Sequence, residues 1–171
     1  MTDRPAWTAD EALEQLYAAH WRSLVRLSVL LVRDQGLAEE VVQEAFVAVH
    51  GRWSRLREPD LALAYLRQAV VNRSRSALRH RAVVQRHADR RTAPLVEAGA
   101  DQAALVGDRR AAVLDALREL PQRQREVLAL RYYLDLSEAE IADALGISRG
   151  AVKSHASRGA AALRLLLQGD L

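Results

Sequence analysis

The sequence contains no cysteine, few aromatic residues, and little glycine or proline. Without cysteine, the chain has no disulfide bond, no thiolate zinc site and no thiol chemistry of its own. With 8 Gly and 4 Pro in 171 residues, long stretches rich in Ala, Leu, Val and Arg run without turn signals. No segment shows a strand pattern. The sequence therefore predicts an all-α fold.

Long apolar runs and signal-peptide features are also missing. The longest apolar runs, such as the one within residues 27–32, are too short to cross a bilayer. The N-terminal residues MTDRPAW lack the pattern of a signal peptide. We therefore expect a cytoplasmic protein with no membrane insertion.

Nothing in the sequence predicts an active site. The histidines are scattered, no paired carboxylates stand among apolar residues at a recognisable spacing, and no glycine-rich loop follows a strand. We expect no catalytic residue, no metal site and no cofactor, and therefore a protein that is not an enzyme.

Residues 136–163, LSEAEIADALGISRGAVKSHASRGAAAL, have the pattern of a helix-turn-helix. Ser137 and Glu140 form a capping box that starts the first helix. Gly146 suits a left-handed turn residue, and Ser148 can cap the second helix. The inward positions of that second helix are Val152, Ala156, Gly159, Ala160 and Leu163.

The outer face of the second helix is polar and positive. Small residues with a few long cations fit a DNA major groove, where Arg and Lys reach guanine edges or phosphates. The alternative is an ordinary helical hairpin with a solvated face. The outward and flanking residues are Arg149, Gly150, Lys153, Ser154, Ser157, Arg158 and Arg164.

Positive charge is concentrated between Arg67 and Arg91, where eight arginines accompany one acid, Asp89, although the net charge of the chain is only +3. Such a segment indicates a polyanion partner, and the alternative is a solvated helix followed by a flexible linker.

Two helical units flank a linker. In the first, Thr8 and Glu11 form a second capping box and start a helix that runs to Arg33. Further helices are expected over 37–52 and 61–81, with a loop at 54–60. Periodicity is lost over 82–107, which contains Pro94 and two glycines. We therefore expect two small helical domains, 1–81 and 108–171, joined by a flexible linker, 82–107.

Three segments in this order resemble the extracytoplasmic-function (ECF) sigma factors, the minimal members of the sigma-70 family of bacterial RNA polymerase. AEEVVQEAF at 38–46 looks like the segment that docks on the polymerase clamp, and AYLRQAVVNRSRSALRHR at 64–81 like the promoter-melting and minus-10 helix. Residues 120–163 are similar to the minus-35 domain. The resemblance implies core polymerase (clamp and flap) and promoter DNA as partners, with an anti-sigma factor as a family expectation.

The resemblance also implies roles for individual residues. Glu40, Gln43 and Glu44 would contact the clamp. Asn72 would stand near a pocket for a flipped base, completed by residues 54–60. The residues expected at the minus-10 strand are Tyr65, Asn72, Arg73, Arg75, Arg79 and Arg81. Those expected at the minus-35 element are Arg149, Lys153, Ser154, Ser157 and Arg158.

The chain departs from the family pattern at three positions. Tyr65 stands where a Trp is frequent, Ser76 where an Asp often follows the Asn, and His155 where many relatives carry Arg. The function expected is promoter-specific initiation from minus-10 and minus-35 elements. The alternatives are a stand-alone helix-turn-helix regulator, which needs a dimer interface and a palindromic site, and a helical adaptor with acidic partners.

Overall fold

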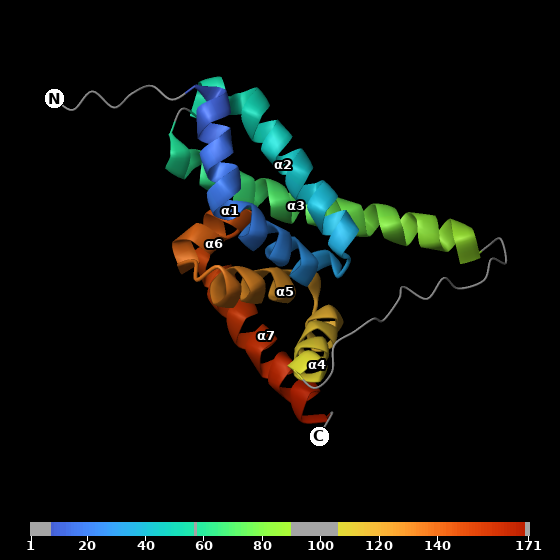
Figure 1. Ribbon diagram of the computed structural model, residues 1–171. Helices are drawn as coiled ribbons and strands as arrows, with labels where there is room; N and C mark the ends of the chain where they lie inside the picture. The colour runs from blue at the N-terminus through green and yellow to red at the C-terminus, as the bar shows by residue number, and fades with distance from the viewer. Residues whose placement is uncertain (1–7, 57, 90–105, 170–171) are drawn as a thin grey trace.

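The structure, a computed structural model, describes residues 8–56, 58–89 and 106–169, and these residues form helices with no strand among them (Figure 1). The all-α prediction is confirmed. The helices in chain order are α1 (Ala9–Val32), α2 (Gln35–Leu56), α3 (Pro59–Asp89), α4 (Val106–Glu119), α5 (Gln122–Leu128), the π-helix η1 (Ala129–Tyr133), α6 (Glu138–Leu145) and α7 (Arg149–Gly169).

Helices α1, α2 and α3 form an N-terminal bundle. The predicted capping box at the start of α1 is present: the Glu11 amide donates to Thr8 Oγ1 at 3.3 Å, and the Thr8 amide donates to Glu11 Oε2 at 3.0 Å. At the turn into α2, Asp34 Oδ1 accepts the Leu37 amide at 2.9 Å, and this hydrogen bond is the main cause that lowers the pKa of Asp34. Local capping thus fixes the first two helices.

The prediction of a loop over 54–60 is wrong for most of its length. Helix α2 continues to Leu56 because Trp53, which is 8% exposed, and the half-buried Leu56 pack against the core of the bundle. Helix α3 already begins at Pro59. Proline suits the first helical position, where its missing N–H group has no helical partner to lose.

Helix α3 also extends further than expected, to Asp89 instead of Arg81. Residues 82–89 contain no glycine or proline, so the helix continues after its buried face has ended, and Val83 and Val84 are about half exposed. The predicted linker 82–107 therefore begins with two turns of helix, and α4 starts at Val106. The rest of that linker lies outside the described residues.

The helix-turn-helix is formed by α6 and α7 as the sequence predicts. Ser137 and Glu140 form both bonds of the capping box, at 3.2 and 2.8 Å, and the bond from the Ser137 amide is the main cause that lowers the pKa of Glu140. Gly146 is left-handed with φ 65°. Ser148 Oγ accepts the Ala151 amide at 3.1 Å and so caps α7.

The inward face of α7 packs on α5. Val152, Ala156 and Gly159 are buried, as expected, while Ala160 and Leu163 are partly buried against a small second cluster. A Cβ at Gly159 would lie 3.1 Å from Gln124 Cβ and 3.2 Å from Leu128 Cδ1. The absence of a side chain there therefore sets how closely α7 approaches α5.

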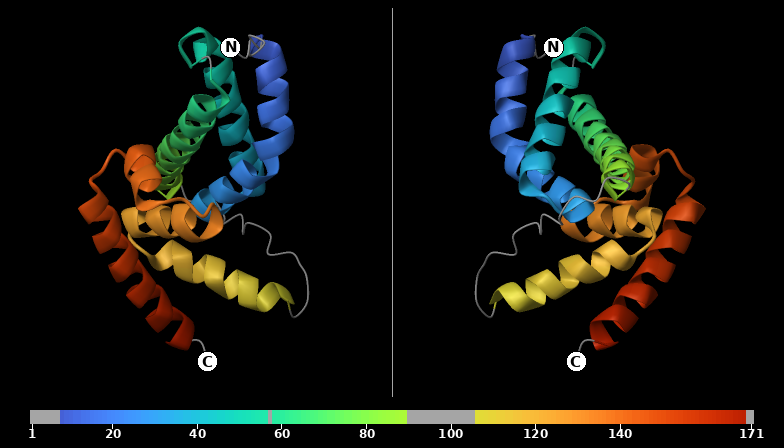
Figure 2. Two further views of the ribbon diagram at one scale, coloured as in Figure 1. Left: turned by 90° about the vertical axis from the view of Figure 1, so that its left-hand side faces the viewer. Right: turned by 90° about the vertical axis from the view of Figure 1, so that its right-hand side faces the viewer.

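The N-terminal bundle and the C-terminal unit pack against each other. Figures 1 and 2 show α5 and α6 directly beneath the bundle, with α4 and α7 on the far side. One hydrophobic cluster includes Leu66 and Val70 of α3 together with Leu130 of η1 and Ile141 of α6. Within the part of the chain that the structure describes, no helix is both long and apolar enough to cross a membrane.

Candidate nucleic-acid interface

The five residues predicted for the minus-35 element share the exposed side of α7. Arg158 bends back along the helix, where its Nη2 donates to Ser154 Oγ at 2.9 Å and its Nε donates to the Ser154 carbonyl at 3.3 Å. Lys153 Nζ lies 3.8 Å from Glu138 Oε2, and its side chain is 69% exposed. All five residues are exposed: Arg149, Lys153, Ser154, Ser157 and Arg158.

This face suits a major groove. Its cations are long and lie between small side chains, so backbone and base edges can approach the helix closely. His155 is partly buried, and its Nδ1 is buried with no hydrogen-bond partner in the structure. It therefore lies at the inner edge of the face.

The residues predicted for the minus-10 strand do not form one open surface. Arg73 Nη1 lies 3.2 Å from Glu44 Oε2 on α2. Arg75 turns the other way, to Glu126 on α5, with bonds of 3.0 and 2.9 Å. Arg81 Nη2 donates to Asp34 Oδ2 at 2.6 Å. Three of the four predicted phosphate-binding arginines are thus paired with acids of other helices or turns.

The remaining residues of this set are more open. Arg79 Nη2 donates to Ser76 Oγ at 3.2 Å on the exposed side of α3. Asn72 is exposed, and its Oδ1 accepts a long bond of 3.5 Å from Arg75 Nη1. Tyr65 is partly buried, with the Arg52 guanidinium 5.3 Å from its ring centroid.

A groove runs between the start of α3 and α6, but it does not include Asn72. Its walls come from both units, so the structure brings Tyr65 and the α2–α3 turn together and leaves Asn72 outside. The lining residues are Leu56, Asp60, Leu61, Leu63, Ala64, Tyr65, Arg67, Gln68, Leu136, Glu140, Asp143 and Ala144. The pocket expected to join Asn72 to residues 54–60 is not tested by this groove and stays a prediction.

The predicted polymerase-binding residues lie on the outer face of α2. Glu40, Gln43 and Glu44 are exposed and border a shallow hollow shared with Val47 and Arg73. Val47 is 67% exposed, so an apolar side chain stands among the acids. A face that combines carboxylates with one apolar contact can bind a basic protein surface.

Sequence reasoning missed two ionic residues of α5, the buried Glu126 and the partly buried Arg125. The Glu126 side chain is only 3% exposed. Arg125 donates to the carbonyls of Leu117, Leu120 and Leu31, and burial lowers the pKa of its guanidinium. The available signal was the position of Glu126 four residues before Leu130, on the face that α5 buries.

Comparison with known proteins agrees with this geometry. Residues 16–83 match the family model for sigma-70 region 2, and residues 110–163 match the model for sigma-70 region 4. The RNA polymerase sigma-E factor of Streptomyces avermitilis is 35% identical over 83% of this chain and 77% of its own length. The chain belongs to the sigma-70 family.

Further relatives of this sigma-70 family member place it among the ECF group. CarQ of Myxococcus xanthus, an RNA polymerase sigma factor, is 34% identical over 95% of this chain and 92% of its own length. The ECF RNA polymerase sigma factor SigM of Mycobacterium tuberculosis is 34% identical over 91% of this chain and 77% of its own length. The resemblance drawn from the sequence is thereby confirmed.

Solved structures share the fold. CnrH, solved in complex with the cytosolic domain of CnrY, is 25% identical with a TM-score of 0.71 over 95% of this chain and 96% of that chain. The sigma factor RpoE of Bartonella quintana, solved with the anti-sigma factor NepR, has a TM-score of 0.69 at 22% identity. The match covers 92% of this chain and 98% of that chain. The second likeness speaks for the fold alone.

Proposed function

We propose that this chain is a promoter-specificity subunit that joins core RNA polymerase and directs initiation from two promoter elements. The observation that carries the proposal is the match to regions 2 and 4, in the family order, on a chain whose α7 presents an exposed basic face. In this assignment residues 1–81 bind polymerase and the minus-10 strand, 82–107 connect, and 108–171 bind the minus-35 element.

Helix α7 anchors the complex on duplex DNA. Ser154 holds the Arg158 guanidinium on the exposed side of the helix, where release of that bond frees two donors for a guanine edge or a phosphate. Arg149 and Lys153 stand on the flanks, where phosphate contacts set the register of the helix in the groove.

Helix α3 captures the opened strand. Opening DNA costs about 1.4 kcal/mol per base-pair step, and a factor without ATP must recover this from bound bases and phosphates. Arg73, Arg75, Arg79 and Arg81 supply the phosphate contacts. Few aromatic residues are present, so capture of one base near Tyr65 and Asn72 fits better than a stacking platform.

The acidic face of α2 binds the polymerase clamp through Glu40, Gln43 and Glu44. Exposed acids beside the apolar Val47 match a basic partner surface with an apolar centre. The C-terminal unit would meet the flap region. The protein itself supplies no catalytic group and no cofactor, works in the cytoplasm beside polymerase, and leaves the chemistry to that enzyme.

An anti-sigma protein is a further proposed partner. Two solved structures of similar fold were determined with a protein bound, and one of these proteins is named as an anti-sigma factor. Such a partner would control when the chain binds core polymerase.

Run-off transcription on fragments of the source genome tests the proposed function. Core polymerase with the chain should produce discrete transcripts that core polymerase alone does not. A stand-alone regulator would instead occupy a palindromic site without polymerase and produce no new transcript, and that result would contradict the proposal.

A further inference from the structure

A cavity of about 560 Å³ lies between α1 and α4, beside the start of α2 and the end of η1. Three apolar residues of α1 line it: Val25, Val29 and Leu30. Leu30 packs against both hydrophobic clusters of the fold, so the cavity lies where these two clusters meet without closing on each other. Sites for small molecules in proteins have volumes of about 300–1,000 Å³ and mostly apolar walls. The cavity therefore has the size and lining of a ligand site.

Aromatic residues and α4 complete the apolar lining. Trp21 of α1 and Tyr133 of η1 are partly buried and line the cavity from the N-terminal bundle and the C-terminal unit. Helix α4 contributes Val113 and Leu114, and Val113 is 38% exposed. An apolar group that enters the cavity would remove this surface from water, which favours its binding.

Three arginines also line the cavity. Arg22 and Arg26 lie one turn apart on α1, Arg110 lies on α4, and all three are exposed. In the part of the chain that the structure describes, none of these three guanidinium groups has a hydrogen-bond or ion-pair partner. The cavity has one carboxylate, that of Glu39, whose Oε1 accepts Gln35 Nε2 at 2.7 Å. The unpaired guanidinium groups favour an anionic ligand, because an anion can accept their N–H groups.

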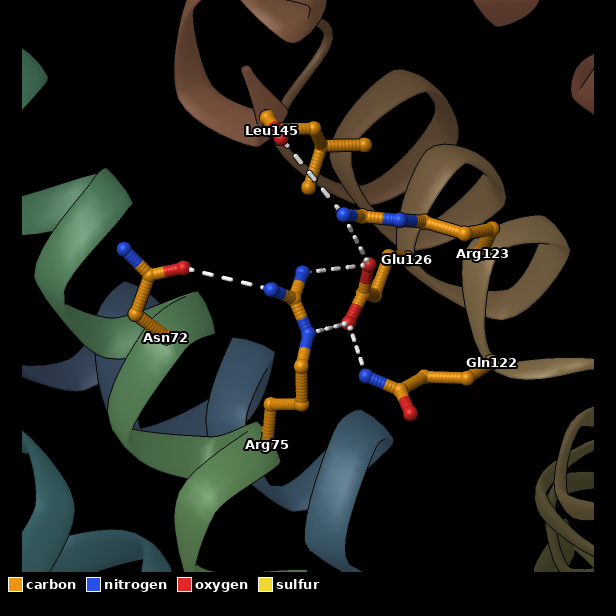
Figure 3. Close-up of polar contacts among 6 residues, drawn as sticks. All are labelled: Asn72, Arg75, Gln122, Arg123, Glu126 and Leu145. Carbon is orange, nitrogen blue, oxygen red and sulfur yellow. Dashed lines mark hydrogen bonds and ion pairs between the residues drawn. The ribbon is translucent and has the colours of Figure 1, made fainter. Parts of the chain in front are cut away.

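The walls are held in place by contacts between the protein's own helices. Arg33, at the end of α1, forms an ion pair with Asp115 of α4, next to the residues of α4 that line the cavity. Figure 3 shows a further link between the two units, from Arg75 of α3 to Glu126 of α5, with bonds of 3.0 and 2.9 Å. A preformed cavity reduces the cost of ordering the protein when a ligand binds.

Three other hollows in the described part of the chain differ in charge. The groove beside Tyr65 is lined by three carboxylates and one arginine, and the hollow on the outer face of α2 by two carboxylates and one arginine. The hollow between η1 and α7 has Arg164 as its single charged residue. The cavity between α1 and α4 combines apolar walls with an excess of cations, and this combination indicates the class of ligand.

The volume of the cavity favours a small molecule over a helix of a partner protein. Two turns of a helix about 10 Å wide occupy roughly 850 Å³. This exceeds the volume of about 560 Å³ that the cavity offers.

We propose that the cavity between α1 and α4 binds a small amphipathic anion, a carboxylate with an apolar body. The body lies against the apolar and aromatic lining, and Arg22, Arg26 and Arg110 hold the carboxylate. The inference goes beyond the proposed function and does not rest on it, because no contact with DNA or polymerase enters the argument. Such a site gives the chain a direct small-molecule input.

Displacement of a neutral dye from the full chain tests the site. N-phenyl-1-naphthylamine fluoresces strongly in apolar surroundings and carries no charge that the arginines could bind. Decanoate should displace the bound dye. Decylammonium, which has a chain of the same length and the opposite charge, should displace it far less at the same concentration. Both compounds are used below the concentrations at which they form micelles.

Two pairs of variants locate the site. Arg110→Gln removes a cation of the cavity, and Arg109→Gln is the matched control at the neighbouring exposed position. Arg110→Gln should raise the decanoate concentration for half displacement about two- to fivefold and leave the affinity for the dye unchanged, since exposed charges contribute modestly. Val113→Phe fills the cavity and should lower the affinity for both dye and decanoate. Val83→Phe, at an exposed valine of α3, should change neither.

The outcomes decide between this site and simpler explanations. Effects confined to Arg110→Gln and Val113→Phe, in variants whose circular dichroism matches that of the natural chain, support the site. Equal effects of Arg110→Gln and Arg109→Gln show attraction by net charge alone and overturn it. Dye binding that survives Val113→Phe, equal displacement by decylammonium, or no dye binding at all also overturns it. The proposed function is tested separately by transcription, so either can fail without the other.

Discussion

Arg73 of α3 and Glu44 of α2 form an ion pair, with 3.2 Å between Arg73 Nη1 and Glu44 Oε2. The pair joins the helix proposed to bind the minus-10 strand to the face proposed to bind the polymerase clamp. Both side chains are substantially exposed, so the pair itself adds little stability. Its importance is that one change at Glu44 affects both surfaces, while a change at Glu40 affects only the polymerase face.

Charge reversal on the α2 face should separate polymerase binding from the binding of duplex DNA by α7. The double variant Glu40→Lys with Glu44→Lys is expected to lower affinity for core polymerase at least about tenfold, since like charges would then face a basic partner. Binding of duplex DNA by α7 should remain. Fluorescence anisotropy of the labelled chain measures its affinity for core polymerase, and Glu14→Lys is the control variant. Unchanged association with polymerase would contradict the clamp assignment.

Arg158→Ala should weaken the duplex anchor selectively. The loss of one groove contact is expected to cost about 1–3 kcal/mol in binding to a minus-35 duplex. Open-complex formation on a pre-melted template should survive, because that step depends on α3. Permanganate reactivity of thymines measures open-complex formation on a fully base-paired template and on a pre-melted one. Equal losses on both templates would mean that Arg158 does not act at a separate upstream element.

His20 should make stability depend on pH. Burial, and next the charge of Arg67, lower the pKa of His20 below its ordinary value of 6.5. The folded chain therefore disfavours the protonated imidazole, so stability that is present above 6.5 is lost as the pH falls through the lowered pKa. Urea unfolding across this range should show a steeper loss for the natural chain than for His20→Gln. Parallel curves for the two proteins would contradict the prediction.

Two glycines of α7 should respond differently to alanine. At Gly150 the nearest atom to an added Cβ is Ser148 Oγ at 3.9 Å, so Gly150→Ala should stabilise the chain by about 0.5–1 kcal/mol. At Gly159 the Cβ would meet Leu128 Cδ1 at 3.2 Å, and the gain in helix propensity should be lost to crowding against α5. Urea unfolding compares the free energies of unfolding of Gly150→Ala and Gly159→Ala. Equal stabilisation would mean that α7 is free to move away from α5.

The sequence predicted best what local signals encode. Capping boxes at Thr8 and Ser137, the left-handed Gly146 and the inward Val152 depend on residues close in the chain, and all are confirmed. Helix ends were predicted poorly where a local signal was misinterpreted. Pro59 suggested a loop but begins α3, which then continues to Asp89.

The packing of the two units could not be predicted, because it depends on complementarity between distant residues. Arg75 and Glu126 are 51 positions apart, and each alone has the pattern of an ordinary charged helix residue. The burial of Glu126 is explained only by the packing of α5 against α3, which brings Arg75 to its carboxylate. For the same reason the sequence could not show that three of the four α3 arginines expected at the minus-10 strand are paired with acids elsewhere.

Chemical footprinting of the complex between polymerase, the chain and a promoter found by run-off transcription tests the central claim most directly. Two anchors predict a protected duplex block at the α7 site and a second block about two helical turns downstream. Thymines in the second block should react with permanganate because the strand is open there. A single palindromic footprint that forms without polymerase, with no reactive thymines when polymerase is added, would contradict the account.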